Sequence, residues 1–350
     1  MSVPLNDKKI GLALGGGAAR GLSHIGVLKI LEDNEIFPDV ITGTSIGALI
    51  GALYAGGVGI RDIEQFALGL DFKRLALLTD ITLPVSGLIS GKRVISLIKS
   101  ILGDLTFSQL KYDFACVATD IITGEQVVLR EGSLVEAVRA SISLPGIFTP
   151  VRINGRHLVD GGLVNEVPVS VCREIGAEYV IGVNVIPEPH KMILSKKQRH
   201  KTTSGKAASQ DKPAEKKPKV ILPEISNQYV QSRIKNVEKS LKSFLSYQTK
   251  LKENLMKSLD WMNLEKSKNT EVKTPNIMEV LVQTLTIAEY WVAVENLKDA
   301  DLVISPEVEE IGFWNFDKAA QAITIGEDAA IRVIQPFMDS GLKSGLRSGR

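Results

Sequence analysis

The sequence is poor in the residues that build disulfide scaffolds and metal centres. Its 350 residues include two cysteines, Cys116 and Cys172, and four histidines. Both cysteines lie in apolar runs, where a thiol acts as a small buried hydrophobic group. Since no Cys or His spacing is typical of a zinc site, we expect neither a disulfide framework nor a metal.

A signal peptide is also missing from the printed sequence. The first ten residues, MSVPLNDKKI, carry charges where a signal peptide needs an apolar run. Together with the low cysteine content, this predicts a cytoplasmic protein. Aromatic residues make up only 5% of the chain. Nucleic acid is disfavoured as a partner, because the basic region at 191–270 has few aromatic rings to stack on bases and the rest of the chain is acidic.

The totals of 42 basic and 40 acidic residues hide two unlike regions. Residues 191–268 hold 19 basic and 7 acidic side chains, whereas the rest of the chain holds 23 and 33. Large apolar residues are absent from 195–219, which predicts a disordered loop. Over 234–262 they recur every three or four residues, with lysines on the other faces, which predicts an amphipathic helix.

Residues 191–270 are therefore interpreted as a basic insertion into a globular domain. A basic amphipathic helix with a lysine-rich flank is typical of a segment that lies on an anionic membrane surface. The alternative is a solvated helix that packs on its own domain or on a second copy of the chain. Both interpretations stay open.

The longest stretch without a charge runs from Val40 to Ile60. Its 21 residues could span a bilayer, and Gly43, Gly47 and Gly51 are spaced like a membrane-helix packing motif. Hydroxyl residues and clustered glycines favour another interpretation. We expect a short strand, a sharp turn and a small-residue helix inside a folded domain.

Strand and helix patterns alternate through the first part of the chain, which predicts a parallel sheet covered by helices on both faces. The expected strands are 9–14, 38–42, 113–120, 126–130, 153–158, 179–185 and 301–305. The expected helices are 18–34, 45–54, 60–70, 91–102, 133–142, 277–297 and 316–338.

Three glycine motifs are candidates for chemistry: GGGAARG at 15–21, GTSIG at 43–47 and DGG at 160–162. Each has another interpretation. The first resembles phosphate-binding loops, but it lacks the lysine of a nucleotide P-loop and places Arg20 where a dinucleotide site needs a small residue. The second is compatible with an ordinary helix N-cap, and the third with a tight turn.

A GxSxG motif between a strand and a helix is typical of a nucleophile elbow, which exposes a serine at a helix N-terminus. Such a serine, here Ser45, needs a base and backbone donors for the oxyanion. His24 is expected to be a packed helix residue, and no histidine follows in the C-terminal part of the chain. A histidine triad is therefore disfavoured.

Taken together and in this order, the motifs resemble those of the patatin-like phospholipase family in its bacterial cytoplasmic form. The segments ASISLPGIFTP and ATDIITGE are similar to that family as well. The resemblance implies a three-layer α/β/α fold with a mostly parallel central sheet and no cofactor. It implies that Ser45 is the nucleophile and Asp160 the base. It also implies roles for the glycine positions: oxyanion donors Gly16, Gly17 and Ala18, supporting loop residues Gly15, Arg20 and Gly21, and elbow glycines Gly43 and Gly47.

We therefore expect a serine acylhydrolase that acts on phospholipid, lysophospholipid or a related acyl ester through an acyl-enzyme. The alternative is a catalytically silent lipid-surface binding or adaptor protein with the same fold. The catalytic domain is expected over 1–190 and 271–340, interrupted by the insertion at 191–270 and followed by a flexible tail at 341–350. The expected location is the cytoplasm, on the inner face of the membrane.

Overall fold

The computed structural model describes residues 8–69, 89–189 and 277–339. The chain divides into two units, of which the first comprises Met1–Pro213 and Val282–Arg350. The description below concerns that first unit. The expected insertion and tail, and most of an expected loop at 75–90, lie outside the described residues, so the domain boundaries stay predictions.

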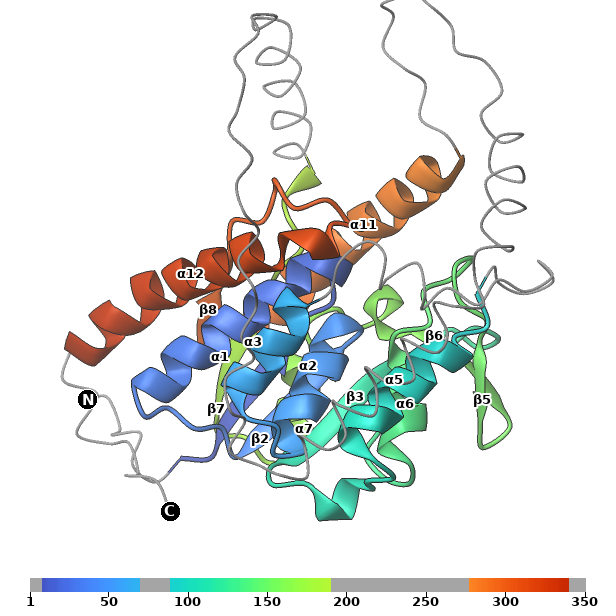
Figure 1. Ribbon diagram of the computed structural model, residues 1–350, viewed down its shortest axis with the longest axis horizontal. Coiled ribbons are helices and arrows are strands. Elements are labelled where there is room, and N and C mark those ends of the chain that lie inside the picture. The colour runs from blue at the N-terminus through green and yellow to red at the C-terminus, as the bar shows by residue number, and fades with distance from the viewer. Residues whose placement is uncertain (1–7, 70–88, 190–276, 340–350) are drawn as a thin grey trace, which may run out of the picture. The chain divides into compact units, whose positions relative to one another are not determined.

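A mixed sheet occupies the centre of this unit (Figure 1). Among the described residues it has eight strands, in the order β5-β6-β3-β2-β1-β7-β8, with β4 also paired to β3. The pairings β1–β2, β1–β7, β2–β3 and β7–β8 are parallel, and those that join β3, β4, β5 and β6 are antiparallel. The strands are β1 Ile10–Leu14, β2 Val40–Thr44, β3 Asp113–Asp120, β4 Gln126–Leu129, β5 Val151–Ile153, β6 Arg156–Asp160, β7 Tyr179–Val183 and β8 Leu302–Ile304.

Helices cover both faces of the sheet, which confirms the expected α/β fold. The α-helices are α1 Ser23–Asp33, α2 Ile46–Ala55, α3 Ile60–Leu68, α5 Lys92–Leu102, α6 Leu134–Ser141, α7 Val169–Glu174, α11 Ile277–Asn296 and α12 Ala319–Asp339. The 3-10 turns are η2 Ala18–Leu22, η3 Phe107–Gln109, η4 Gly161–Leu163, η5 Leu297–Asp299 and η6 Phe316–Lys318. In Figure 1 the long helices α1 and α12 lie side by side, and their residues are in contact.

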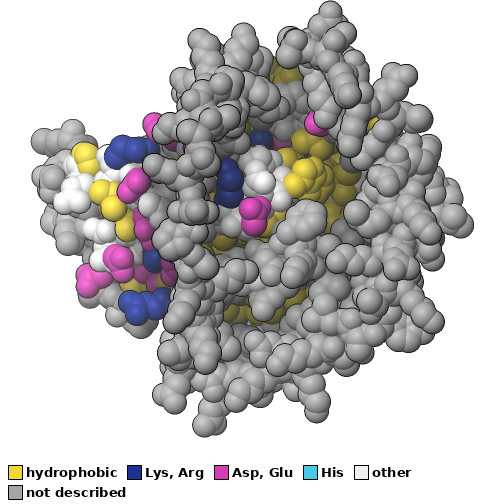
Figure 2. Space-filling view, turned by 45° about the horizontal axis from the view of Figure 1, so that its top comes forward, with side chains coloured by type: hydrophobic (Ala, Val, Ile, Leu, Met, Phe, Trp, Pro, Cys, Tyr) yellow, Lys and Arg dark blue, Asp and Glu magenta, His cyan; other side chains and the backbone are white. Residues whose placement is uncertain are grey.

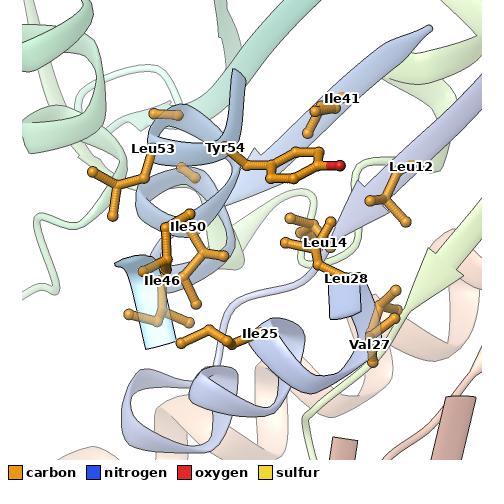
Figure 3. Packing of buried hydrophobic residues seen from close by; sticks show 14 of the residues in the cluster. Leu12, Leu14, Ile25, Val27, Leu28, Ile41, Ile46, Ile50, Leu53 and Tyr54 are labelled. Atoms are coloured by element: carbon orange, nitrogen blue, oxygen red, sulfur yellow. The ribbon is translucent and has the colours of Figure 1, made fainter. Parts of the chain in front are cut away.

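The alternation of side chains along β1 separates two layers of core. Leu12 and Leu14 pack with residues of α1, α2 and α12, whereas Ala13 packs with residues of α7 and with Ala293 of α11. Figure 3 shows Leu14 close to Leu28 of α1 and facing the side of α2 that carries Ile50. Since successive side chains of a strand point to opposite faces, β1 is buried on both.

The uncharged stretch from Val40 to Ile60 forms β2 and α2, joined by a single residue, Ser45. This agrees with the expectation of a strand, a turn and a helix. No helix in the described part of the chain is long and apolar enough to cross a membrane.

One expected strand is wrong. Residues 153–158 belong to two strands, β5 and β6, which form a hairpin around Asn154 and Gly155. These two residues have φ values of 50° and 80°, as a two-residue hairpin turn requires. The sequence carries the signal for this turn, the Asn154-Gly155 pair, inside the expected strand. Helix α7 was not expected, and the helix predicted from residue 18 begins with the separate 3-10 turn η2.

Candidate active site

The three glycine motifs meet at one edge of the sheet. The motif at 15–21 follows β1 and the motif at 43–47 ends β2, and these strands are parallel, so both motifs lie at their carboxyl ends. Strand β6 runs antiparallel to β3 and brings Asp160 opposite Ala118, while Thr44 of β2 lies opposite Val117. The strand register therefore places Ser45 and Asp160 on the two sides of β3. The carboxyl edge is where open α/β sheets usually bind ligands.

Ser45 occupies a strained turn between β2 and α2. Its φ of 53° and ψ of −121° are unusual for a residue with a side chain. A Cβ atom at Gly43 would lie 2.5 Å from the amide nitrogen of Ala48, and one at Gly47 would lie 2.6 Å from the carbonyl oxygen of Gly15. Both flanking positions therefore need glycine.

The side chains of this turn do not form an ordinary helix cap. Ser45 is at the N-cap position of α2, but its hydroxyl makes no capping hydrogen bond. The hydroxyl of Thr44 donates instead to the carbonyl of Asn165, at 2.7 Å. The N-cap interpretation of GTSIG is thus wrong, and the Ser45 hydroxyl is available for other chemistry.

The side chains of Ser45 and Asp160 lie close enough together that hydrogen bonding by the Ser45 hydroxyl lowers the pKa of the Asp160 carboxyl group. Asp160 is almost completely buried, and its Oδ1 also accepts the backbone N–H of Gly162, at 2.9 Å. Burial raises the pKa of Asp160 to about 6, although both hydrogen bonds act in the opposite direction. A carboxylate with a pKa close to neutrality is suited to general-base catalysis. The DGG motif does form a tight turn, η4, and that turn carries the carboxylate.

Two backbone N–H groups of the glycine-rich turn have no hydrogen-bond partner among the described residues. Gly15 donates to the carbonyl of Val183 at 3.0 Å, and Gly16 donates to the carbonyl of Glu166 at 3.2 Å. Within the described ranges, no hydrogen bond uses the N–H of Gly17 or Ala18. Both have positive φ, 127° and 51°. Of the three expected oxyanion donors, Gly16 is thus already engaged by Glu166.

Buried side chains hold this turn from behind. Arg20 donates from Nε to the carbonyl of Ile311, at 3.0 Å, and burial lowers its pKa to about 10 against the attraction of Glu289 and Glu166. His24 donates from Nε2 to the carbonyl of Gly15, at 2.8 Å. Burial lowers the pKa of His24 to about 4, so the ring is neutral. His24 is therefore a packed residue, as expected. At Gly21, a Cβ atom would press on Ile46 at the start of α2, 3.0 Å from its Cγ1.

Two residues that contact Ser45 and Asp160 were not expected to do so. Ser141, at the end of α6, accepts the backbone N–H of Ser45 at 3.0 Å. Thr119 of β3 donates from its hydroxyl to the carbonyl of Asp160 at 2.8 Å. Ser141 lies in the ASISLPGIFTP segment, whose resemblance to a family gave no role to any single residue. Thr119 lies in the ATDIITGE segment, whose resemblance to a family likewise gave no role to any single residue.

Two buried glutamates were also missed. Glu166 and Glu289 are 1% and 5% exposed, and both lie close enough to Asp160 to be affected by its charge. Burial is the first cause of their raised pKa values, which for Glu289 reaches about 8. Glu166 follows the DGG motif by a few residues, whereas Glu289 is in α11. The sequence between them gives no pattern that links the two.

These features define an α/β protein with a serine on a strained strand-to-helix turn, close to a buried aspartate. The model of the patatin-like phospholipase family matches residues 12–173, which include Ser45 and Asp160. This part of the chain belongs to the patatin-like phospholipase family, as the three motifs indicated.

Known proteins are similar to about half of this chain. The uncharacterized NTE family protein Rv1063c of Mycobacterium tuberculosis is 32% identical over 180 residues, 51% of this chain and 50% of that protein. The neuropathy target esterase sws of Drosophila melanogaster is 36% identical over 186 residues, 52% of this chain and 13% of that protein. The chain spans half the length of these curated relatives or less. The crystal structure of VipD from Legionella pneumophila aligns with a TM-score of 0.36 and 15% identity, over 92% of this chain and 75% of that one.

Proposed function

We propose that this protein is a serine acylhydrolase that cleaves acyl esters of phospholipids, lysophospholipids or related lipids. The observation that carries the proposal is the closeness of the Ser45 hydroxyl, on its strained strand-to-helix turn, to the buried carboxyl group of Asp160. Membership of residues 12–173 in the patatin-like phospholipase family supports a lipid ester as the substrate. The similarity to a protein named neuropathy target esterase supports the same class.

The proposed reaction is acyl transfer in two steps. Asp160 accepts the hydroxyl proton while Oγ of Ser45 attacks the ester carbonyl carbon, and the carbonyl oxygen becomes an oxyanion. The tetrahedral intermediate then expels the alcohol, which takes the proton from Asp160, and the acyl group stays on Ser45. Water then attacks the acyl carbon while Asp160 accepts its proton, the bond from that carbon to Oγ of Ser45 breaks, and Asp160 returns the proton to Oγ as the fatty acid leaves.

The proposed oxyanion site is formed by the free N–H groups of Gly17 and Ala18. Backbone donors aimed at a developing oxyanion typically contribute about 3 kcal/mol each to the stability of the transition state. The N-terminus of α2, directly after Ser45, adds a favourable dipole. Gly16, whose N–H is engaged by Glu166, is proposed to hold the turn in place.

A fluorophosphonate probe and a short-chain chromogenic ester test this proposal together. Wild-type protein should be labelled and should release the chromophore, while Ser45→Ala should do neither. Asp160→Asn should react about a thousandfold more slowly, because the general base is lost. Ser96→Ala removes an exposed serine of α5 and should behave like wild type.

Two outcomes would contradict the proposal. Full hydrolysis by folded Ser45→Ala would remove Ser45 from the reaction. A folded wild-type protein that binds lipid vesicles but is neither labelled nor active would favour the alternative, a silent lipid-surface binding protein.

We further propose that an anionic membrane surface is a partner of the chain, on the cytoplasmic face. The basic composition of 191–270 supports this, since each basic residue near an anionic surface contributes roughly 1 kcal/mol. Exposed apolar side chains on α11 support it as well: Ile287, Trp291 and Val294 are 41%, 65% and 37% exposed and share one helix face. Figure 2 shows hydrophobic side chains reaching the surface beside charged ones.

Binding to vesicles tests this partner. The full chain should bind phosphatidylserine vesicles more strongly than phosphatidylcholine vesicles, and added salt should weaken the binding. Deletion of 191–270 should weaken binding to the anionic vesicles and leave hydrolysis of a soluble ester intact. Equal binding by the deletion variant would overturn the role of the insertion.

A further inference from the structure

Glu166 connects three elements around the proposed dyad. Its backbone carbonyl accepts the N–H of Gly16 in the glycine-rich turn, and its backbone N–H donates to Oδ1 of Asn296, at 2.8 Å, at the end of α11. Its side chain is 1% exposed and lies next to the turn that carries Asp160. A displacement of Glu166 would therefore disturb all three elements at once.

The carboxyl group of Glu166 occupies space beside Gly16 and Gly162 that a side chain at either position would need. A Cβ atom at Gly16 would lie 2.6 and 2.8 Å from its two oxygens. A Cβ atom at Gly162 would overlap its Oε2, and would lie 3.4 Å from both Oδ1 of Asp160 and Cγ of Glu289. The glutamate thus sits between the glycine-rich turn and the DGG turn, beside Asp160 and Glu289.

The charges in this buried group do not balance if all three carboxyls are ionised. In the described residues, Arg20 is the one cation that acts on Glu166 and Glu289, and both glutamates are also affected by the charge of Asp160. The group is not arranged as a metal site, and no cluster in the described ranges is. A buried cation can balance one buried carboxylate, and further ones are disfavoured by desolvation and mutual repulsion.

Asp160 is the carboxyl that keeps its charge. It accepts hydrogen bonds from Ser45 and Gly162, which stabilise the carboxylate, and its pKa is about 6. Glu289, by contrast, has a pKa of about 8, and the pKa of Glu166 is well above its ordinary value. Oε1 of Glu166 has no hydrogen-bond partner in the described structure. A neutral acid tolerates such a site far better than a carboxylate does.

We propose that Glu166 and Glu289 remain protonated at neutral pH, that Glu166 is a positioning residue that holds the glycine-rich turn next to the DGG turn, and that the site is inactivated when Glu289 ionises in alkaline solution. This inference rests on the proposed acylhydrolase function. Ionised Glu289 would place a second negative charge beside Asp160, compete for Arg20 and repel the oxyanion that forms in the reaction. Loss of the proton from Glu289 would therefore switch the proposed hydrolase activity off as the pH rises.

The protonation state can be measured without any substrate. In full-length protein labelled with 13C at the glutamate carboxyl carbons, two NMR signals should still report the protonated form at neutral pH. One signal should disappear in Glu166→Gln and the other in Glu289→Gln, whereas Glu136→Gln, at an exposed position of α6, should keep both. If both glutamates are ionised at neutral pH, the proposal is overturned.

The pH dependence of kcat/KM on a soluble ester tests the switch. Wild-type activity should fall above about pH 8, and in Glu289→Gln this alkaline limit should move up by about one pH unit or more while the acid limit stays in place. Glu136→Gln should keep the wild-type profile. A merely structural role for Glu289 would lower the rate equally at every pH, and an unmoved alkaline limit would refute the switch.

Rescue by the conservative variant tests the positioning role of Glu166. Glu166→Gln keeps the shape of a neutral acid and should be at least about tenfold more active at neutral pH than Glu166→Ala, which leaves a cavity between the two turns. Equal activity of the two variants would contradict this role. If wild-type protein hydrolyses no ester at all, the proposed function fails, and the NMR titration still decides whether the glutamates are protonated.

Discussion

The backbone N–H of Ser45 donates a hydrogen bond to the hydroxyl of Ser141, and this hydroxyl donates in turn to the carbonyl of Val117, at 2.6 Å. One buried side chain thus ties the turn of the proposed nucleophile to β3, the strand that separates it from Asp160.

Ser141→Ala should weaken both stability and activity. The partly buried N–H of Ser45 loses its partner, and a fully buried donor left unsatisfied costs about 1–3 kcal/mol, which is an upper limit here. The strained turn also loses a support, so we expect an approximately tenfold lower kcat with little change in KM. Urea unfolding and hydrolysis of a soluble ester would measure the two effects, with Ser96→Ala as the control. A Ser141→Ala protein as stable and as active as wild type would show that the hydrogen bond is dispensable.

The acid side of the pH profile should report Asp160. Its pKa of about 6 is raised by burial, and only the ionised form can accept the Ser45 proton. Activity should therefore rise as the pH increases through about 6 and become level until the alkaline decrease above about pH 8 begins. A limit near pH 4, where an ordinary aspartate titrates, would contradict a buried base.

Gly47→Ala should disrupt the nucleophile elbow. The added methyl group would lie 2.6 Å from the carbonyl oxygen of Gly15, and overpacking of this kind costs about 1–3 kcal/mol. Gly59→Ala is the matched control, since Gly59 has an ordinary φ of −59° and the nearest atom, Oδ2 of Asp62, would be 3.4 Å away. Thermal unfolding should separate the two variants. Equal stability would mean that the elbow can move to accept a methyl group.

Glu289→Gln should make the free energy of unfolding less dependent on pH. Because the pKa of Glu289 is raised from 4.5 to about 8 by burial, the folded chain binds this proton more tightly than the unfolded chain. The stabilisation is complete below about pH 4.5 and is lost as the pH rises to about 8, by about 1.4 kcal/mol per pH unit. Urea unfolding across this interval should show a smaller decline in the variant. Parallel declines in both proteins would argue against a protonated Glu289.

The sequence predicted the parts of the fold and site that short motifs encode. A strand that ends in GTSIG determines its own turn, since the glycines on either side of Ser45 leave few other conformations. The pairing of Ser45 with Asp160 came from the order of the three motifs and a family resemblance. The hairpin turn at Asn154 and Gly155 is also predictable from the sequence, because that pair strongly favours a two-residue turn.

The buried surroundings of the dyad could not be predicted in this way. Glu289 looks like any acidic residue of an amphipathic helix, and only the packing of α11 brings it near Asp160. Ser141 sits at the end of a helix whose sequence predicts its burial but not its partner. Such contacts depend on which elements become neighbours in the sheet, and this information is not local.

The glycines of the site have a consequence for engineering. At Gly16, Gly43, Gly47 and Gly162, any side chain would collide with backbone or with a buried carboxyl group. The turns that carry the proposed reacting groups are therefore packed so closely that none of these four glycines can be replaced by a larger residue without displacing its neighbours. Attempts to redesign substrate preference should leave these four glycines unchanged and vary the exposed positions around them.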